Sequence, residues 1–242
     1  MTQSRSAQDF LDEVRPHLGS VPSVSEDYTC PVCLGPVTPG FARCYACGQL
    51  LPQMPAILSG RIIPISSALK PGPWYGRLRE YKITRPEYMS TLAALAHLYV
   101  NAHADAIADL LGGTPTAIAA VPSTRGWQPK QQPLYRALDR SSVLRTKLRV
   151  LQKHDGSAVD RREYKPAAFP AVASLSGERV ILVEDLWVTG AKAVSAAGAL
   201  MAARASVVVL VIGREVNSTY TDDDHPYRAA MKVPFDIDSW PR

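Results

Sequence analysis

The sequence lacks the features that would place it among membrane, repeat or disordered proteins. No run of apolar residues approaches the roughly 18 that a membrane-spanning helix requires. The N-terminal residues lack the basic-then-apolar pattern of a secretory signal, so we expect a cytoplasmic protein with no membrane partner. No internal repeat and no low-complexity tract occurs in the 242 residues, of which 46% are hydrophobic. We therefore expect one substantial core with a small accessory module.

Cysteine is scarce, and charge is moderate. The chain has four cysteines, and a cytoplasmic protein keeps its thiols reduced, so metal binding explains paired cysteines better than disulfides do. Charged residues make up 20% of the chain, with a net charge of +5 and a pI near 9.1. This excess of cations favours anionic partners such as nucleotides, phosphosugars or nucleic acid.

The cysteines form two C-x-x-C pairs separated by ten residues: Cys30, Cys33, Cys44 and Cys47. Two such turns complete the tetrahedral shell that structural zinc prefers, so we predict a zinc ribbon over residues 26–52. We expect positive φ at Gly35 and Gly48, which follow the pairs. The alternative is unligated or redox-active cysteines, although a redox site needs only one pair. Arg43 is the one charged residue between the cysteine pairs, which favours a structural or protein-docking ribbon over DNA contact.

Apolar patterns predict an α/β core. Three apolar runs without alternation are typical of strands in a parallel sheet covered on both faces: 116–121, 179–183 and 206–212. Helical patterns occupy 6–18, 88–111 and 191–203. The last two strands and the helix between them form a βαβ unit.

The end of the second predicted strand carries the most informative motif. Glu184 and Asp185 follow apolar residues there, and a short loop with Thr189 and Gly190 leads into the next helix. A helix N-terminus binds anions through its free amides, and Gly190 would admit a phosphate closely. Neighbouring carboxylates suit the hydroxyls of a vicinal diol. The alternative is an ordinary strand-to-helix turn that is acidic by chance.

This segment resembles the phosphoribosyl pyrophosphate signature of the type I phosphoribosyltransferases. In that family an acid pair holds the ribose hydroxyls and a Thr-rich loop holds the 5-phosphate, roles that fall on Glu184 and Asp185 and on the loop after them. The corresponding loop residues are Leu186, Trp187, Val188, Thr189, Gly190, Ala191 and Lys192. Val188 and Lys192 replace the usual threonines, and Lys192 offers a charge-assisted contact to phosphate.

A zinc ribbon followed by this loop resembles the ComF-like family over most of the chain. The resemblance implies a type I phosphoribosyltransferase-like sheet with helices on both faces. It places pyrophosphate contacts in the loop after the first strand, at Ser123, Thr124, Arg125 and Gly126. It also implies a catalytic flap over residues 144–169, with Arg162 as a catalytic residue beside Arg125, Glu184 and Asp185. The implied segments are an extension (1–25), the ribbon (26–52), a linker or hood (53–90) and the phosphoribosyltransferase-like domain (91–242).

The function implied by this resemblance is binding of phosphoribosyl pyrophosphate with Mg²⁺. Transfer of the phosphoribosyl group to a base or amine, with release of pyrophosphate, would make the protein a glycosyltransferase of the pentosyltransferase class. The alternatives are a non-catalytic sensor of a phosphoribosyl ligand and an accessory protein of competence-related DNA uptake or processing. Turnover, the acceptor and homodimer formation are left open.

Overall fold

The computed structural model describes residues 5–241, so residues 1–4 and 242, at the ends of the expected extension and C-terminal domain, lie outside it. Its centre is a parallel sheet with the order β1-β4-β3-β2. The strands are β1 (Ile62–Lys70), β2 (Ala117–Ala120), β3 (Arg179–Trp187) and β4 (Ser206–Asn217). The parallel α/β architecture predicted from the apolar runs is confirmed.

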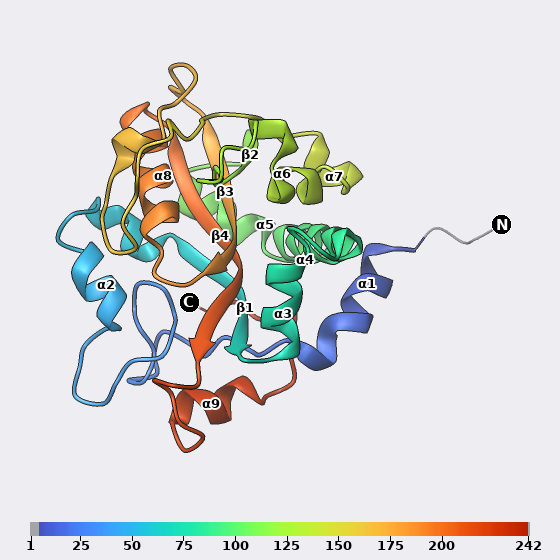
Figure 1. Cartoon of the computed structure of the whole chain (residues 1–242), viewed down its shortest axis with the longest axis vertical. Coiled ribbons are helices and arrows are strands. Elements are labelled where there is room, and N and C mark those ends of the chain that lie inside the picture. The colour runs from blue at the N-terminus through green and yellow to red at the C-terminus, as the bar shows by residue number, and fades with distance from the viewer. Residues whose placement is uncertain (1–4, 242) are drawn as a thin grey trace.

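Helices cover both faces of the sheet (Figure 1). One face packs against α8 (Ala191–Ala202) and the cysteine-bearing segment with α2 (Tyr45–Leu50). The other face packs against the remaining core helices: α1 (Ala7–Val14), α3 (Pro73–Glu80), α4 (Met89–Ala102), α5 (Ala104–Leu111), α6 (Pro133–Leu138) and α7 (Ser142–Arg145). None of the helices within residues 5–241 is long and apolar enough to cross a membrane.

Short helical turns and one late helix complete the structure. The last helix is α9 (Pro226–Met231), which follows β4. Five 3₁₀ turns connect the longer elements: Arg15–His17, Ala56–Gly60, Pro86–Tyr88, Pro129–Gln131 and Pro166–Ala168.

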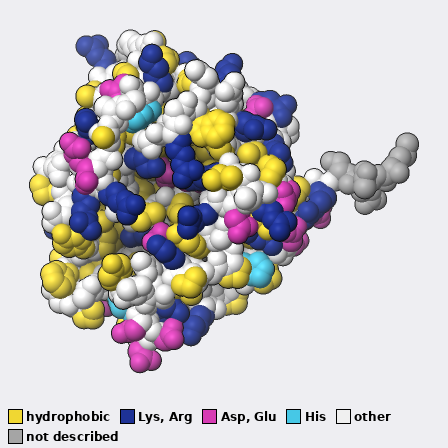
Figure 2. All heavy atoms as spheres, viewed as in Figure 1, with side chains coloured by type: hydrophobic (Ala, Val, Ile, Leu, Met, Phe, Trp, Pro, Cys, Tyr) yellow, Lys and Arg dark blue, Asp and Glu magenta, His cyan; other side chains and the backbone are white. Residues whose placement is uncertain are grey.

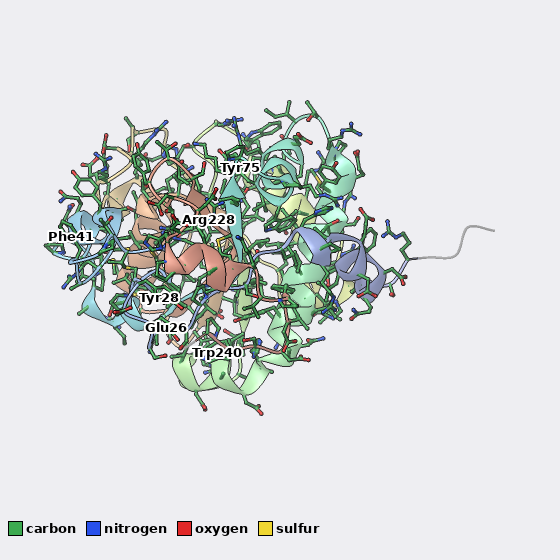
Figure 3. The ribbon with its side chains drawn as sticks, turned by 90° about the horizontal axis from the view of Figure 1, so that it is seen from below. Glu26, Tyr28, Phe41, Tyr75, Arg228 and Trp240 are labelled. Atoms are coloured by element: carbon green, nitrogen blue, oxygen red, sulfur yellow. The ribbon has the colours of Figure 1, made fainter. Side chains whose placement is uncertain are left out.

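The helix predicted over 88–111 is interrupted at His103. Its backbone leaves the helical region there (φ −116°, ψ 28°), and α5 begins at the next residue. The His103 Nε2 donates to the carbonyl of Ile237 at 2.9 Å, and the His103 ring lies 5.1 Å from that of Trp240. Figure 3 shows Trp240 against this helical layer. Contacts with the C-terminal tail, which no local pattern reveals, thus accompany the break.

Strand β1 falls inside the segment expected as a linker or hood. Its first seven residues are buried, and it pairs with β4 over its whole length. Pro64 and two serines interrupt its apolar run, which is why the sequence did not predict this strand. Proline is tolerated here because β1 is an edge strand, and one side of an edge strand needs no ladder hydrogen bond. Within residues 5–241 the sheet therefore has four strands, where the sequence predicted three.

The cysteine-bearing segment is attached to the C-terminal part of the chain through α9. The Tyr227 hydroxyl donates to the carbonyl of Leu34 at 2.7 Å, and His225 Nε2 donates to the carbonyl of Val37 at 3.0 Å. Figure 3 shows Tyr28 beside α9, whereas Phe41 lies at the outer edge of the molecule. The segment is thus packed onto the sheet and does not extend away from it.

Candidate metal centre and anion site

The four cysteines converge to form a metal-binding cluster. The Sγ atoms of Cys30, Cys33, Cys44 and Cys47 all lie within 4.8 Å of one another, and all four residues are buried. Tetrahedral zinc with bonds of about 2.3 Å places its sulfurs roughly 3.8 Å apart, and the Cys33 and Cys44 sulfurs are 3.7 Å apart. The four thiols fit structural zinc in number, chemistry and spacing.

The backbone around the cluster differs from the expectation of positive φ at Gly35 and Gly48. The positive φ belongs to Leu34 (53°), and Gly48 lies inside α2. Gly35 is required for another reason: a Cβ on this residue would overlap the guanidinium of Arg214, with Cζ only 2.7 Å away. Glycine is therefore required at position 35 by contact with the Arg214 side chain of β4, and not by the backbone conformation of the turn.

Arg214 is buried beside the cluster and affects its ionisation. Hydrogen bonds from Cys30 and the other two cysteines, together with the charge of Arg214, lower the pKa of Cys33 well below its usual value. Burial alone would lower the pKa of Arg214, but the charges of Cys33 and Cys44 raise it. The guanidinium therefore stays charged, and the cluster supplies its counter-charge.

Glu184 and Asp185 lie in the part of β3 that extends beyond the end of the neighbouring strand β2. Strand β2 ends at Ala120, which pairs with Val183, so the next two residues of β3 border the loop that follows β2. The acids are therefore inside strand β3, which continues to Trp187, and are not in the loop after it. Both are buried, with 9% and 5% of their surfaces exposed. Ligands of parallel α/β sheets bind at this carboxyl end.

Asp185 is held by two side chains from the end of α3 and the residues after it. The Tyr81 hydroxyl donates a short hydrogen bond to Asp185 Oδ2, and Lys82 Nζ lies 2.7 Å from the same oxygen. Burial works to raise the pKa of Asp185, but Lys82 and Tyr81 outweigh it and lower that pKa. Asp185 is therefore an ionised acceptor.

Glu184 has the opposite ionisation behaviour. Burial and the neighbouring charge of Asp185 raise its pKa to about 8, although Lys192 and Lys82 act against this shift. At neutral pH the Glu184 carboxyl is mostly protonated. The pair thus presents one carboxyl that donates a hydrogen bond and one carboxylate that accepts.

A pocket of about 140 Å³ opens beside the acid pair. Six of the predicted site residues line it: Ser123, Thr124, Arg125, Glu184, Asp185 and Lys192. Lys82, Trp127 and Gln132 also line it. Figure 2 shows Lys and Arg side chains across the middle of one face of the molecule, with Asp and Glu atoms between them. The pocket combines three cations, one carboxylate and one neutral carboxyl.

The loop residues predicted to bind phosphate have mixed orientations. Leu186 and Trp187 turn their side chains into the core on opposite faces of the sheet, and Val188 is exposed. Gly190 has φ of 86°, and a Cβ there would overlap the Trp187 indole. The Cβ side of Gly190 is therefore filled by this indole, which accounts for a glycine at this position without reference to a ligand. Of the loop side chains between 186 and 192, only that of Lys192 lines the pocket.

Two further predicted residues lie away from the pocket lining. The Arg162 guanidinium stacks over the Tyr45 ring of α2, 4.9 Å from its centroid. Gly126 has φ of 72° at a turn that does not border the pocket. The structure therefore does not bring Arg162 to the acid pair.

Three polar residues of the pocket were not singled out from the sequence: Tyr81, Lys82 and Gln132. The first two lie in the segment expected as a linker or hood, directly after α3. Gln132 is buried and accepts from the Ser123 amide at 2.8 Å, fixing the loop after β2. A lone glutamine carries no sequence signal for such a role.

No protein-family model matches the chain, and no curated protein matches it either. The ComF-like resemblance therefore stays a prediction made from motifs.

We predict one zinc per chain and a core that depends on it. The cysteines share one apolar cluster with residues of β3, β4 and α8, so loss of the metal should lower the unfolding temperature of the whole fold. Metal analysis of purified protein and thermal unfolding with and without a thiol-competing chelator test this. Chelation should lower Tm by about 10 °C or more. Absence of zinc together with an unchanged Tm would contradict the assignment.

We predict that Glu184→Gln stabilises the protein at pH 8 and leaves its stability nearly unchanged at pH 5. Because the folded-state pKa is raised above 4.5 to about 8, the fold loses stability as pH rises through this window. The glutamine variant lacks that loss, so its advantage should grow from under about 1 kcal/mol at pH 5 to about 4 kcal/mol at pH 8. Chemical unfolding at several pH values measures it.

Glu178→Gln is the matched control for this measurement. Hydrogen bonds from Thr116 and Arg149 lower the pKa of Glu178, so its replacement should not stabilise the protein at high pH. A Glu184→Gln effect that is the same at pH 5 and pH 8 would show that this carboxyl is not perturbed.

Proposed function

We propose that the chain binds a phosphorylated ribose, as phosphoribosyl pyrophosphate or a related phosphosugar, in the pocket beside Glu184 and Asp185. The observation that carries the proposal is the placement of this acid pair at the carboxyl end of β3, facing a pocket shared with three cations. The cations are Lys82, Arg125 and Lys192. At about 140 Å³ the pocket is smaller than the roughly 300–1,000 Å³ of drug-sized sites, so it suits one sugar-sized group.

The unequal ionisation of the acids supports recognition of a vicinal diol. Asp185 accepts, and a protonated Glu184 both donates and accepts, so the two together satisfy neighbouring hydroxyls. Asp185 Oδ2 already receives Tyr81 and Lys82, so the hydroxyls of the ligand would pair with the remaining carboxyl oxygens of the two residues. An ordinary acidic turn would instead expose both carboxylates to water.

The start of α8 supports binding of the phosphate. Gly190 caps this 12-residue helix without a side-chain acceptor, so no capping side chain competes for the first-turn amides. The helix dipole and free amides favour an anion at this end. Lys192, in the first turn, is exposed and lines the pocket, so it can add a charge-assisted contact.

The acid pair does not fit a protein-held Mg²⁺. Asp185 Oδ2 already receives Lys82 and Tyr81, and Glu184 has a pKa near 8. Among the described residues the one group of potential metal ligands is the cysteine cluster. We therefore derive no step through Mg²⁺, and the positive charge for the ligand comes from Lys82, Arg125 and Lys192.

Transfer of the phosphoribosyl group to a base or amine is the second candidate. It is favoured by Ser123 and Arg125, which line the same pocket as the acid pair from the loop after β2, where the type I phosphoribosyltransferases hold pyrophosphate. The stacking of Arg162 over Tyr45 of α2, away from the pocket lining, favours binding without turnover. Within the ComF-like resemblance, a ligand sensor or an accessory protein of DNA uptake would use the same pocket without chemistry.

We predict that Asp185→Asn weakens binding of phosphoribosyl pyrophosphate by about 30-fold or more. It removes the charged acceptor while keeping the shape, and loss of one partner of a buried ion pair costs about 2–5 kcal/mol. Isothermal titration with and without Mg²⁺ measures the affinity. Asp109→Asn, at an exposed acid on α5, is the matched control and should bind as the unaltered protein does.

A screen for pyrophosphate release over free bases and ammonia separates the candidates. Binding without release supports a sensor, and release supports transfer. Equal affinity of the Asp185→Asn and Asp109→Asn variants would remove the basis of the proposal, as would failure of the unaltered protein to bind.

A further inference from the structure

We infer that Arg214 is a positioning residue that connects the cysteine cluster to the loop at the start of α8. Metal in the ribbon would then hold residues 188–191 in the shape that receives phosphate. This inference rests on the proposed function for its ligand, but the connection itself depends only on Arg214 and its surroundings.

One edge of the guanidinium faces the ribbon. Arg214 is 6% exposed and lies against Gly35, whose carbonyl accepts from the Cys30 amide at 2.8 Å. Its Nε is buried and has no hydrogen-bond partner among the described residues. A thiolate bound to a metal is a natural acceptor for such a donor, and ligand sulfurs commonly receive hydrogen bonds of this kind.

The other edge holds the backbone that leads into the loop. Arg214 Nη1 donates to the carbonyls of Trp187 at 3.1 Å and Val188 at 3.4 Å, and to that of Glu215 at 2.6 Å. Trp187 also pairs with Arg214 across β3 and β4. Val188 directly precedes Thr189 and Gly190, so the position of one guanidinium fixes where the loop begins.

Charge links the two edges. Zinc with four thiolates carries a formal charge of about −2, which balances a buried guanidinium. Without the metal, nothing holds the turn from Cys30 to Gly35 at a fixed position against the guanidinium, so Arg214 can shift. That movement would release the Trp187 and Val188 carbonyls. Occupancy of the cysteine cluster is thereby coupled to loop geometry through a single side chain.

Backbone ¹⁵N relaxation of residues 188–191 tests this connection, in zinc-loaded and chelated samples of the unaltered protein and of Arg214→Lys. In the unaltered protein we expect order parameters near about 0.85 with zinc and below about 0.6 without it. Arg214→Lys keeps the charge but loses the fork of donors, so its loop should be disordered in both samples. Chelation should then cause little further loss of loop order in this variant. Such non-additivity would indicate that zinc and Arg214 act on the loop through the same contacts.

Two more variants keep the result interpretable. Arg61→Lys is the matched control, because Arg61 contacts Ser206 at the opposite end of β4 and should leave the loop unchanged. Gly35→Ala displaces the guanidinium without altering it, so its loop should resemble that of Arg214→Lys while zinc is retained. Equal chelation effects in the unaltered protein and Arg214→Lys would overturn the inference. Loss of order spread evenly over β1 and β2 would overturn it too, since that indicates general destabilisation.

Titration with ribose 5-phosphate then separates this inference from the proposed function. If both hold, zinc-loaded protein should bind it about 10-fold more tightly than chelated protein, and Arg214→Lys should remove the difference. If zinc-loaded protein does not bind the probe while the relaxation pattern holds, the proposed function fails and the connection stands. Binding that is equally strong with and without zinc would remove the role of Arg214 in ligand affinity.

Discussion

A charged side chain that is buried needs compensating groups nearby, and this requirement governs the surroundings of Arg214 and of Asp185. Arg214 is buried among apolar side chains, and the thiols of the cysteine cluster and three backbone carbonyls surround it. Asp185 is buried as well, and Lys82 and Tyr81 compensate it. Neither buried charge can be considered apart from its partners, because removing the partners leaves the charge uncompensated.

Both buried charges join segments that are distant in the chain. Arg214 on β4 meets the turn at Gly35, and Lys82 after α3 meets Asp185 on β3. The cysteines belong to the same apolar cluster as Val207 and Val209 of β4. The ribbon is therefore a layer of the α/β core, and its metal chemistry lies close to the structural elements that shape the pocket.

The sequence predicted the features that depend on local residues. Apolar runs located three strands, cysteine spacing located the cluster, and the acid pair located the carboxyl end of β3. Features set by distant contacts were not accessible. His103 breaks a helix where Ile237 and Trp240 dock, Pro64 hides an edge strand, and Gly35 is required by Arg214, 179 positions away. The role of Lys82 could not be predicted because it follows α3, whereas its partner Asp185 lies on β3, about a hundred residues later. The local sequence around a glycine or a lysine does not predict which distant side chain will contact it in the folded protein.

The order of the strands has a consequence for how the chain matures. Among the described strands β1 pairs with β4 alone, and β4 is the last of them to be synthesised. While the ribosome makes the intervening residues, this apolar strand lacks its partner in the sheet, although Ser67 can already pair with Gly19. Such segments are prone to aggregation during biogenesis and are common clients of chaperones. The closing step of assembly is the insertion of β4 between β1 and β3, which requires residues separated by more than half of the polypeptide to meet.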